Sequence, residues 1–188
     1  MTALTYEVIE PERRNRLTVG FRLILAIPHL IVAHLWSQLA GLLGLIQWFI
    51  VLFTGRRNEG IRSLQTAFLR YYGRVLGYIG LLYDEWPSFT DECTGQPVTT
   101  LRLEQTANRL TNALRLIWAI PAIIIALALG IAGSVVTLIA WFAILFTGRH
   151  PRGMWQFGRD VTHYSLQLQA YTFLATDTYP KFRGATEG

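Results

Sequence analysis

Two long apolar blocks dominate the pattern of hydrophobic and polar positions along this chain. They run from Leu17 to Thr54 and from Leu110 to Thr147, and each contains a single charged residue, an arginine near its start. As one helix, a block of about 38 residues would reach roughly 57 Å, nearly twice the ~30 Å hydrocarbon core of a bilayer. The pattern therefore predicts two short transmembrane helices per block, joined by a tight turn.

The turns are expected near the middle of each block, at Trp36–Gly41 and at Gly130–Gly133. Each predicted span has only about 18 residues, which is the lower end of the spanning range. A hairpin that only partly crosses the bilayer therefore stays open as an alternative. The predicted spans cover about 17–36, 38–54, 110–129 and 131–147.

Each apolar block is followed by an amphipathic segment, at about 60–83 and about 153–175. Apolar residues recur there at helical spacing, with basic or polar residues on the other side. Such a helix lies in the membrane interface or packs across the ends of the spanning helices. In the first segment the polar side carries arginines that favour contact with anionic lipid headgroups: Arg62, Arg70 and Arg74.

The chain repeats itself at an offset of 93 residues. This shift aligns Asn15–Thr18 with Asn108–Thr111, and Leu52–Arg56 with Leu145–Arg149. Matches along one offset without a gap indicate a duplication. We therefore predict two repeat units, at 1–92 and 108–188, joined by a linker at 93–107.

The predicted fold class is an all-α integral membrane protein with two tandem helical-hairpin units, four transmembrane helices in all, and an interfacial helix after each hairpin. The expected outer turns, 35–47 and 128–140, contain no charged residue. The positive-inside rule then predicts a multi-pass protein of the inner (plasma) membrane with both termini cytoplasmic. An even number of spans per unit makes the units parallel, related by a pseudo-twofold axis along the membrane normal.

Composition favours the same class. Hydrophobic residues make up 52% of the 188 residues and charged residues 15%, whereas soluble proteins carry about 25% charged residues. A net charge of +5 would suggest nucleic acid as a partner of a soluble protein. Here the basic residues lie outside the apolar blocks or at their entry edges, so we expect membrane lipids and no nucleic acid. The single cysteine, Cys93, excludes an internal disulfide.

The two units differ most in the polar residues of their apolar blocks. Polar groups are expensive in hydrocarbon, so they mark contacts with a function. The first block is thus predicted to face another polypeptide or to border a polar cavity. Its candidate contact residues are His29, His34, Ser37, Gln38 and Gln47, and their equivalents in the second block are Ala122, Leu127, Gly130, Ile131 and Ala140.

Two acidic residues, Asp84 and Asp177, occupy equivalent places after the amphipathic segments. The arginines of the apolar blocks, Arg22 and Arg115, lie too deep to be free of an electrostatic cost. We therefore expect each arginine to pair with the acid of its own unit and to pin the amphipathic helix to the hairpin.

No motif for catalysis, for a cofactor or for a metal accompanies these residues. There is no His-Glu-x-x-His, no nucleotide-binding loop and no cysteine cluster. His29 and His34 are five residues apart and point about 140° away from each other on a helix, so they cannot jointly bind one metal ion. The sequence therefore predicts no catalytic, cofactor-binding or metal-binding residue and no enzyme.

The stretches Arg22–His29 and Ala140–Arg149, with the Tyr-Pro-x-Phe ending at Phe182, resemble a family of prokaryotic membrane proteins. That family is described as a domain of unknown function, number 4389, and the resemblance covers nearly the whole chain in two copies. The departures are modest, since Ala122 replaces the histidine of the Pro-His pair and only the second unit has a proline at Pro151. The resemblance implies a membrane location and the two-span unit, and it supplies no activity.

These observations predict a non-catalytic membrane subunit, a scaffold or accessory component of a larger assembly. Its partner would be another membrane protein or a second copy of the chain. The alternative is a small channel or carrier with a path between the two units or within an oligomer. The absence of an acidic residue in mid-span disfavours this alternative.

Overall fold

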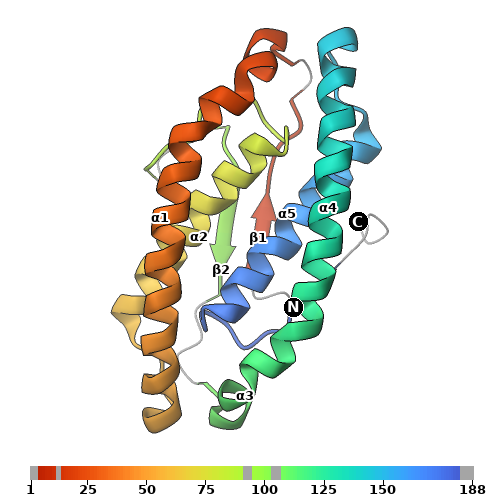
Figure 1. Cartoon of the computed structure of the whole chain (residues 1–188). Coiled ribbons are helices and arrows are strands. Elements are labelled where there is room, and N and C mark those ends of the chain that lie inside the picture. The colour runs from red at the N-terminus through yellow and green to blue at the C-terminus, as the bar shows by residue number, and fades with distance from the viewer. Residues whose placement is uncertain (1–3, 12–13, 91–94, 103–106, 183–188) are drawn as a thin grey trace.

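The computed structural model describes residues 4–11, 14–90, 95–102 and 107–182, and the chain is mostly helical, as predicted. The two ends of the chain, whose cytoplasmic location the sequence predicts, lie partly outside these residues. Figure 1 shows the arrangement, in which two long helices flank two shorter ones and a small sheet. The elements are β1 (Leu4–Glu7), α1 (Arg16–Thr54), α2 (Glu59–Ile79), β2 (Val98–Leu101), α3 (Arg109–Ala113), α4 (Arg115–Thr147) and α5 (Arg152–Thr172).

The first apolar block is one continuous helix, α1, so the predicted turn at Trp36–Gly41 is wrong. The side chain of Asn15 caps its start by accepting hydrogen bonds from the backbone N–H groups of Leu17 and Thr18. The helix ends at Gly55, whose φ of 72° is the left-handed conformation that glycine adopts easily. An unpaired peptide group in apolar surroundings is costly, and the helix continues between these ends, through Pro28.

The second block repeats this outcome, and the predicted turn at Gly130–Gly133 is also wrong. The short helix α3 leads through Leu114 into α4, which ends at Gly148 with a φ of 72°. In the middle of α4, Ser134 Oγ donates to the carbonyl oxygen of Gly130, four residues earlier, as in a regular helix. Two helices are thus long and apolar enough to cross a membrane among the described residues, and the prediction of four is not supported.

The two long helices are antiparallel. Trp48, near the end of α1, donates from its indole N–H to the carbonyl oxygen of Asn112, 2.9 Å away at the start of the second block. The repeat-equivalent Trp141, near the end of α4, donates to the carbonyl oxygen of Val19 at the start of α1, also over 2.9 Å. Because each unit gives the other the same bond, a pseudo-twofold axis that lies across the long helices relates the units, and the prediction that the two units are parallel is wrong.

The amphipathic helices α2 and α5 lie in the interior, and the prediction of interfacial helices is wrong. They pack on each other and each on the long helix of its own unit, so that α1, α2, α5 and α4 follow one another across the molecule (Figure 1). Their apolar stripes face these neighbours, and Arg62 and Arg74 on the other side of α2 are buried as well. The amphipathic pattern therefore describes burial within the chain and not contact with lipid.

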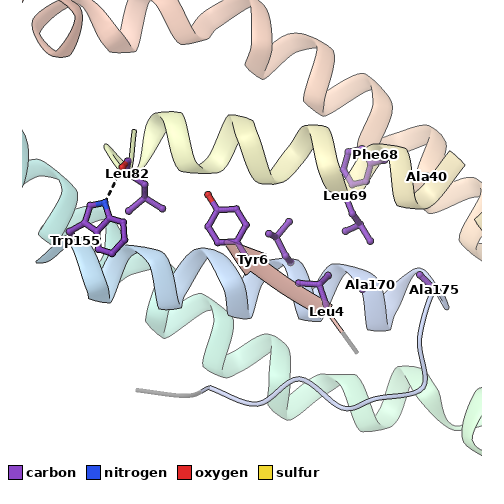
Figure 2. Close-up of a cluster of buried hydrophobic side chains, with 10 residues drawn as sticks. Leu4, Tyr6, Ala40, Phe68, Leu69, Leu82, Trp155, Ala170 and Ala175 are labelled. Carbon is purple, nitrogen blue, oxygen red and sulfur yellow. Dashed lines mark hydrogen bonds between the residues drawn. The ribbon is translucent and has the colours of Figure 1, made fainter. Parts of the chain in front are cut away.

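A two-stranded antiparallel sheet, which the all-α prediction missed, covers α2 and α5. Strand β1 pairs with β2, which lies in the predicted linker, with Leu4 opposite Leu101 and Glu7 opposite Val98. Leu4 and Tyr6 of β1 reach between α2 and α5 into the largest hydrophobic cluster (Figure 2). Tyr6 Oη also donates to the carbonyl oxygen of Gly73, 3.2 Å away, which fixes the sheet against α2.

The continuity of α4 can be tested at Gly130, where an added Cβ would have no neighbour within 4 Å. In a helix interior, Gly130→Ala should raise the free energy of unfolding by about 0.5–1 kcal/mol, because alanine loses less conformational entropy. Equilibrium unfolding in detergent measures this change. Gly148→Ala is the matched control and should lower stability, since its φ is positive. A loss of stability in Gly130→Ala would contradict the continuous helix.

Candidate functional site: two buried arginine clusters and an exposed polar pair

Arg22 of α1 holds together the first unit at the point where α2 ends. Its Nη1 donates to the carbonyl oxygens of Tyr78 and Tyr83, at 3.0 and 2.8 Å, and its Nη2 lies 2.7 Å from Asp84 Oδ1. The guanidinium stacks over the Tyr78 ring, with its central carbon 4.4 Å from the ring centroid. The arginine is 1% exposed, so a fully buried cation receives an anion, two carbonyl oxygens and an aromatic face.

Arg115 makes the same contacts in the second unit. Its Nη1 donates to the carbonyl oxygens of Tyr171 and Thr176, at 2.6 and 2.9 Å, its Nη2 pairs with Asp177, and it stacks over the Tyr171 ring. The structure thus brings together, in both units, the arginine and the acid that the repeat pairs in the sequence.

Each arginine cluster forms where the backbone leaves a helix and turns. The last carbonyl groups of a helix have no regular partner inside the helix, and here the neighbouring helix supplies an arginine that binds one of them in each unit, at Tyr78 and at Tyr171. After α2 and α5 the chain turns through Leu81 and Leu174, which both have a φ of 61°. A left-handed conformation is strained for leucine, and the arginine bonds on either side of it hold the turn in place.

A second arginine enters each cluster, from a different place in the repeat. Arg14 lies 3.0 Å from Asp84 through Nη1, and its Nη2 donates to the carbonyl oxygen of Leu81. In the second cluster the corresponding cation is Arg57, which belongs to the first unit and pairs with Asp177 at 2.5 Å. The first cluster therefore takes its second arginine from its own unit, and the second cluster takes it from the other unit.

The repeat equivalents of these two arginines are uncharged in the folded protein. Arg14 corresponds to Ala107 and Arg57 to His150. Burial lowers the pKa of His150 to about 4, partly offset by the hydrogen bond with the Pro151 carbonyl group and reinforced by nearby Arg14. His150 is therefore neutral near pH 7, and each cluster keeps two arginines beside one aspartate.

Two of the predicted partner contacts, His29 and Gln47, are buried inside this chain, so the prediction that they face another polypeptide or a cavity is wrong. His29 Nδ1 lies 2.8 Å from Tyr71 Oη, whereas in the second unit the equivalent Tyr164 donates directly to the Ala122 carbonyl oxygen. Gln47 Oε1 accepts from the backbone N–H of Asn58. The second unit needs no such glutamine, since the residue equivalent to Asn58 is a proline and lacks that N–H.

The remaining predicted contacts lie on the outside of α1. His34 and Gln38 are exposed, and their Nε2 atoms lie 3.5 Å apart, while Ser37 is half-buried beside them. Their equivalents on α4, Leu127 and Ile131, are exposed as well. His34 and Gln38 are thus a polar pair that the protein's own core does not require.

The arginines predicted to bind headgroups have other surroundings. Arg62 and Arg74 are buried, and Arg70 is half-buried beside strand β2. Exposed arginines occur instead at the ends of the long helices, Arg16 and Arg149 at one end and Arg56 and Arg109 at the other. In the described part of the chain, no group of three or more His, Cys, Asp or Glu residues could hold a metal ion.

Sequence reasoning missed Arg14, Arg57 and the two tryptophan bonds between the units. Trp48 and Trp141 carry a signal, because the repeat preserves a tryptophan whose N–H needs a partner when it is half-buried. Arg14 and Arg57 carry none, since the repeat replaces both.

The fold defines a class, a helical protein of two inverted repeats in which each repeat completes the packing of the other. The chain belongs to the family described as Domain of unknown function (DUF4389), whose model matches residues 16–91 and 109–183 as two tandem copies. The duplication and the family resemblance are therefore confirmed. No curated protein and no solved structure matches the chain.

The second cluster takes its second arginine from the other unit, and this predicts that an arginine placed in its own unit can restore the stability lost without Arg57. Arg57→Ala should lower the free energy of unfolding by roughly 3 kcal/mol, because it removes a buried cation that pairs with the half-buried Asp177 and binds the Leu174 carbonyl oxygen. Adding Ala107→Arg should restore more than half of that loss, since position 107 is the repeat equivalent of Arg14. Chemical unfolding of both variants measures the effect. An Ala107→Arg substitution that lowers stability further in the Arg57→Ala background would contradict the equivalence.

His150 predicts an acid-dependent loss of stability. Its pKa is lowered to about 4 in the folded protein, from 6.5, so the unfolded chain takes up the proton first. The stability that a neutral His150 provides is complete above about pH 6.5 and is lost as the pH falls toward 4. Unfolding midpoints at pH 7 and pH 5 should differ less in His150→Gln than in the unmodified protein. His34→Gln, at an exposed histidine, is the control, and an equal pH dependence in both variants would contradict the assignment.

Proposed function

We propose that this protein is a non-catalytic membrane scaffold or accessory subunit, embedded through the outer faces of α1 and α4. These faces carry large exposed apolar side chains along their whole length, among them Phe21, Phe53, Ile131 and Phe146. No charged residue occurs from 23 to 55 or from 116 to 148. A soluble protein rarely exposes an apolar patch of this extent. The core helix of a soluble protein would be mostly buried, whereas only 6% of the residues in the apolar stretch of α4 are buried.

The charges at the ends of the long helices support the same placement. The exposed arginines Arg16 and Arg149 flank the apolar faces at one end, and Arg56 and Arg109 flank them at the other. Basic residues at the borders of an apolar surface attract anionic headgroups, each contributing about 1 kcal/mol near a charged leaflet. These four residues therefore replace Arg62, Arg70 and Arg74 as the proposed headgroup contacts, and they favour the cytoplasmic leaflet.

The small sheet favours long helices that lie along the membrane and not upright across it. Tyr6 of β1 binds Gly73 of α2, two residues beyond Tyr71, which binds His29 of α1. The sheet therefore lies beside the apolar stretch of α1, and its exposed Glu7 lies there too. Strand edges and charges avoid hydrocarbon. We therefore propose one leaflet for the apolar faces and water for the sheet, in place of a multi-pass arrangement.

His34 and Gln38 carry the proposal that this protein docks a partner. The pair lies in the middle of α1 with large apolar side chains around it, Leu30, Ile31 and Leu42. Polar side chains on an otherwise apolar face are costly in lipid and bind across helix interfaces in membranes. The partner proposed is a second membrane chain that hydrogen-bonds this pair. A channel between the units gains no comparable support, because the space between them is lined mainly by apolar side chains.

Docking at this pair predicts a difference between two equivalent positions. A photoreactive amino acid at Gln38 should cross-link a discrete protein in native membranes, while the same residue at Ile131 of α4 should cross-link lipid. A second chain carries the photoreactive residue at Leu42 and the double substitution His34→Leu with Gln38→Ile. These substitutions place on α1 the residue types that α4 has at the equivalent positions, so the protein adduct should fall at least about fivefold. Mass spectrometry of the adducts measures both results.

The matched control is Leu127→Val with Ile131→Val, which alters the outer face of α4 without polar groups and should leave the Leu42 adduct unchanged. Lipid adducts alone at both Gln38 and Ile131 would contradict docking through α1. An unchanged protein adduct in the double variant would remove His34 and Gln38 from the interface.

A further inference from the structure

A cavity of about 600 Å³ lies between the two units. Its walls are the middle of α4, the first half of α5 and the end of α2, with Arg22 and Leu23 of α1 at one end. The volume lies within the range of roughly 300–1,000 Å³ that is typical of small-molecule sites. The lining is almost entirely apolar or small: Leu76, Gly80, Gly130, Leu138, Gly158 and Val161 are among its residues.

The cavity occurs at only one of two places that the repeat makes equivalent. These two places are called the two halves of the molecule. At the equivalent place in the other half, Phe173 packs over Gly44 and Gly41, and its ring centroid lies 5.8 Å from that of Phe68. Phe68 also stacks on Tyr72, at 5.2 Å. Three aromatic side chains thus fill the space in one half. Their equivalents in the other half are small, namely Gly80 for Phe173, Val161 for Phe68 and Ser165 for Tyr72.

The backbone does not require a small residue at the end of α2. Gly80 has φ −71° and ψ 5°, and the equivalent Phe173 has φ −81° and ψ 5°. A phenylalanine is therefore compatible with this conformation, and glycine at this position leaves space without serving a turn.

Two buried polar residues, Arg22 and Thr162, line the cavity, which opens toward the outer apolar face. Thr162 is 7% exposed and lines the cavity, and no described residue hydrogen-bonds its hydroxyl group. Its equivalent in the filled half is the buried Leu69. Leu23 and Leu138, which also line the cavity, are exposed on the outer faces of α1 and α4. The space is therefore continuous with the surface proposed to lie in the leaflet, and Thr162 offers a hydroxyl donor inside it.

From this geometry we infer that the cavity binds one acyl chain of a membrane lipid taken from the surrounding leaflet. The chain lies where Phe173, Phe68 and Tyr72 lie in the other half, so that apolar contacts replace the missing aromatic rings. The Thr162 hydroxyl donates to an oxygen of the acyl ester. The inference rests on the proposed membrane placement and adds a specific lipid site to it.

The test uses the full chain in phosphatidylcholine vesicles whose lipid carries a diazirine on the acyl chain. After illumination, peptide mapping should find adducts on α5 at 158–165, which the chain reaches only through the cavity, besides adducts on the outer faces of α1 and α4. Gly80→Phe and, separately, Val161→Phe should reduce the α5 adducts about tenfold or more, because each restores a ring of the filled half. Leu127→Phe, which adds a ring on the outer face, is the control and should leave them unchanged.

The outcomes separate the lipid site from the membrane placement. Outer-face adducts without α5 adducts would overturn the acyl-chain site and leave the membrane placement intact. The absence of adducts at both places would overturn the placement and the site that rests on it. Undiminished α5 adducts in Val161→Phe, with the fold verified by circular dichroism, would also overturn the site, even where Gly80→Phe fails to fold.

Discussion

The structure depends on two buried arginines, each of which binds the end of a neighbouring helix. Arg22 and Arg115 donate to carbonyl oxygens in the last turns of α2 and α5, and each pairs with an aspartate just beyond that helix end. A buried charge is costly unless it is paired and hydrogen-bonded, so these bonds determine where α2 and α5 lie. Because α2 and α5 are held inside, the outer faces of α1 and α4 are left exposed.

The inverted repeat explains why one unit would not suffice. The tryptophan of each long helix binds the start of the other unit, and the second cluster contains an arginine from the first unit, Arg57. Two differences between the repeat units support the proposed functions. His34 and Gln38 distinguish the outer face of α1, and the small residues around Thr162 open a cavity in one half only. The first difference supports docking, and the second supports a lipid site.

The sequence predicted the repeat, the helical segments after each block and the meeting of Arg22 with Asp84, because offset matches and buried charges are visible in it. It did not predict continuous long helices, since the hairpin was inferred from bilayer thickness and not from a turn signal. The assignment of Arg62 and Arg74 to lipid failed for a related reason, because an amphipathic pattern does not tell membrane from protein interior. His29 and Gln47 could have been assigned inside only by knowing that Tyr71 and Asn58 lie opposite them.

The placement of α1 and α4 in one leaflet, with the sheet in water, is tested most directly by cysteine labelling. In a chain with Cys93→Ser, single cysteines at Glu7 and at Leu127 are exposed on the sheet and on the outer face of α4. With the protein in vesicles, a membrane-impermeant maleimide should label position 7 rapidly and position 127 only after detergent is added. Protection of position 7 in intact vesicles would contradict the account, because the sheet would then lie at hydrocarbon depth. Rapid labelling of both positions would show that the long helices are not embedded.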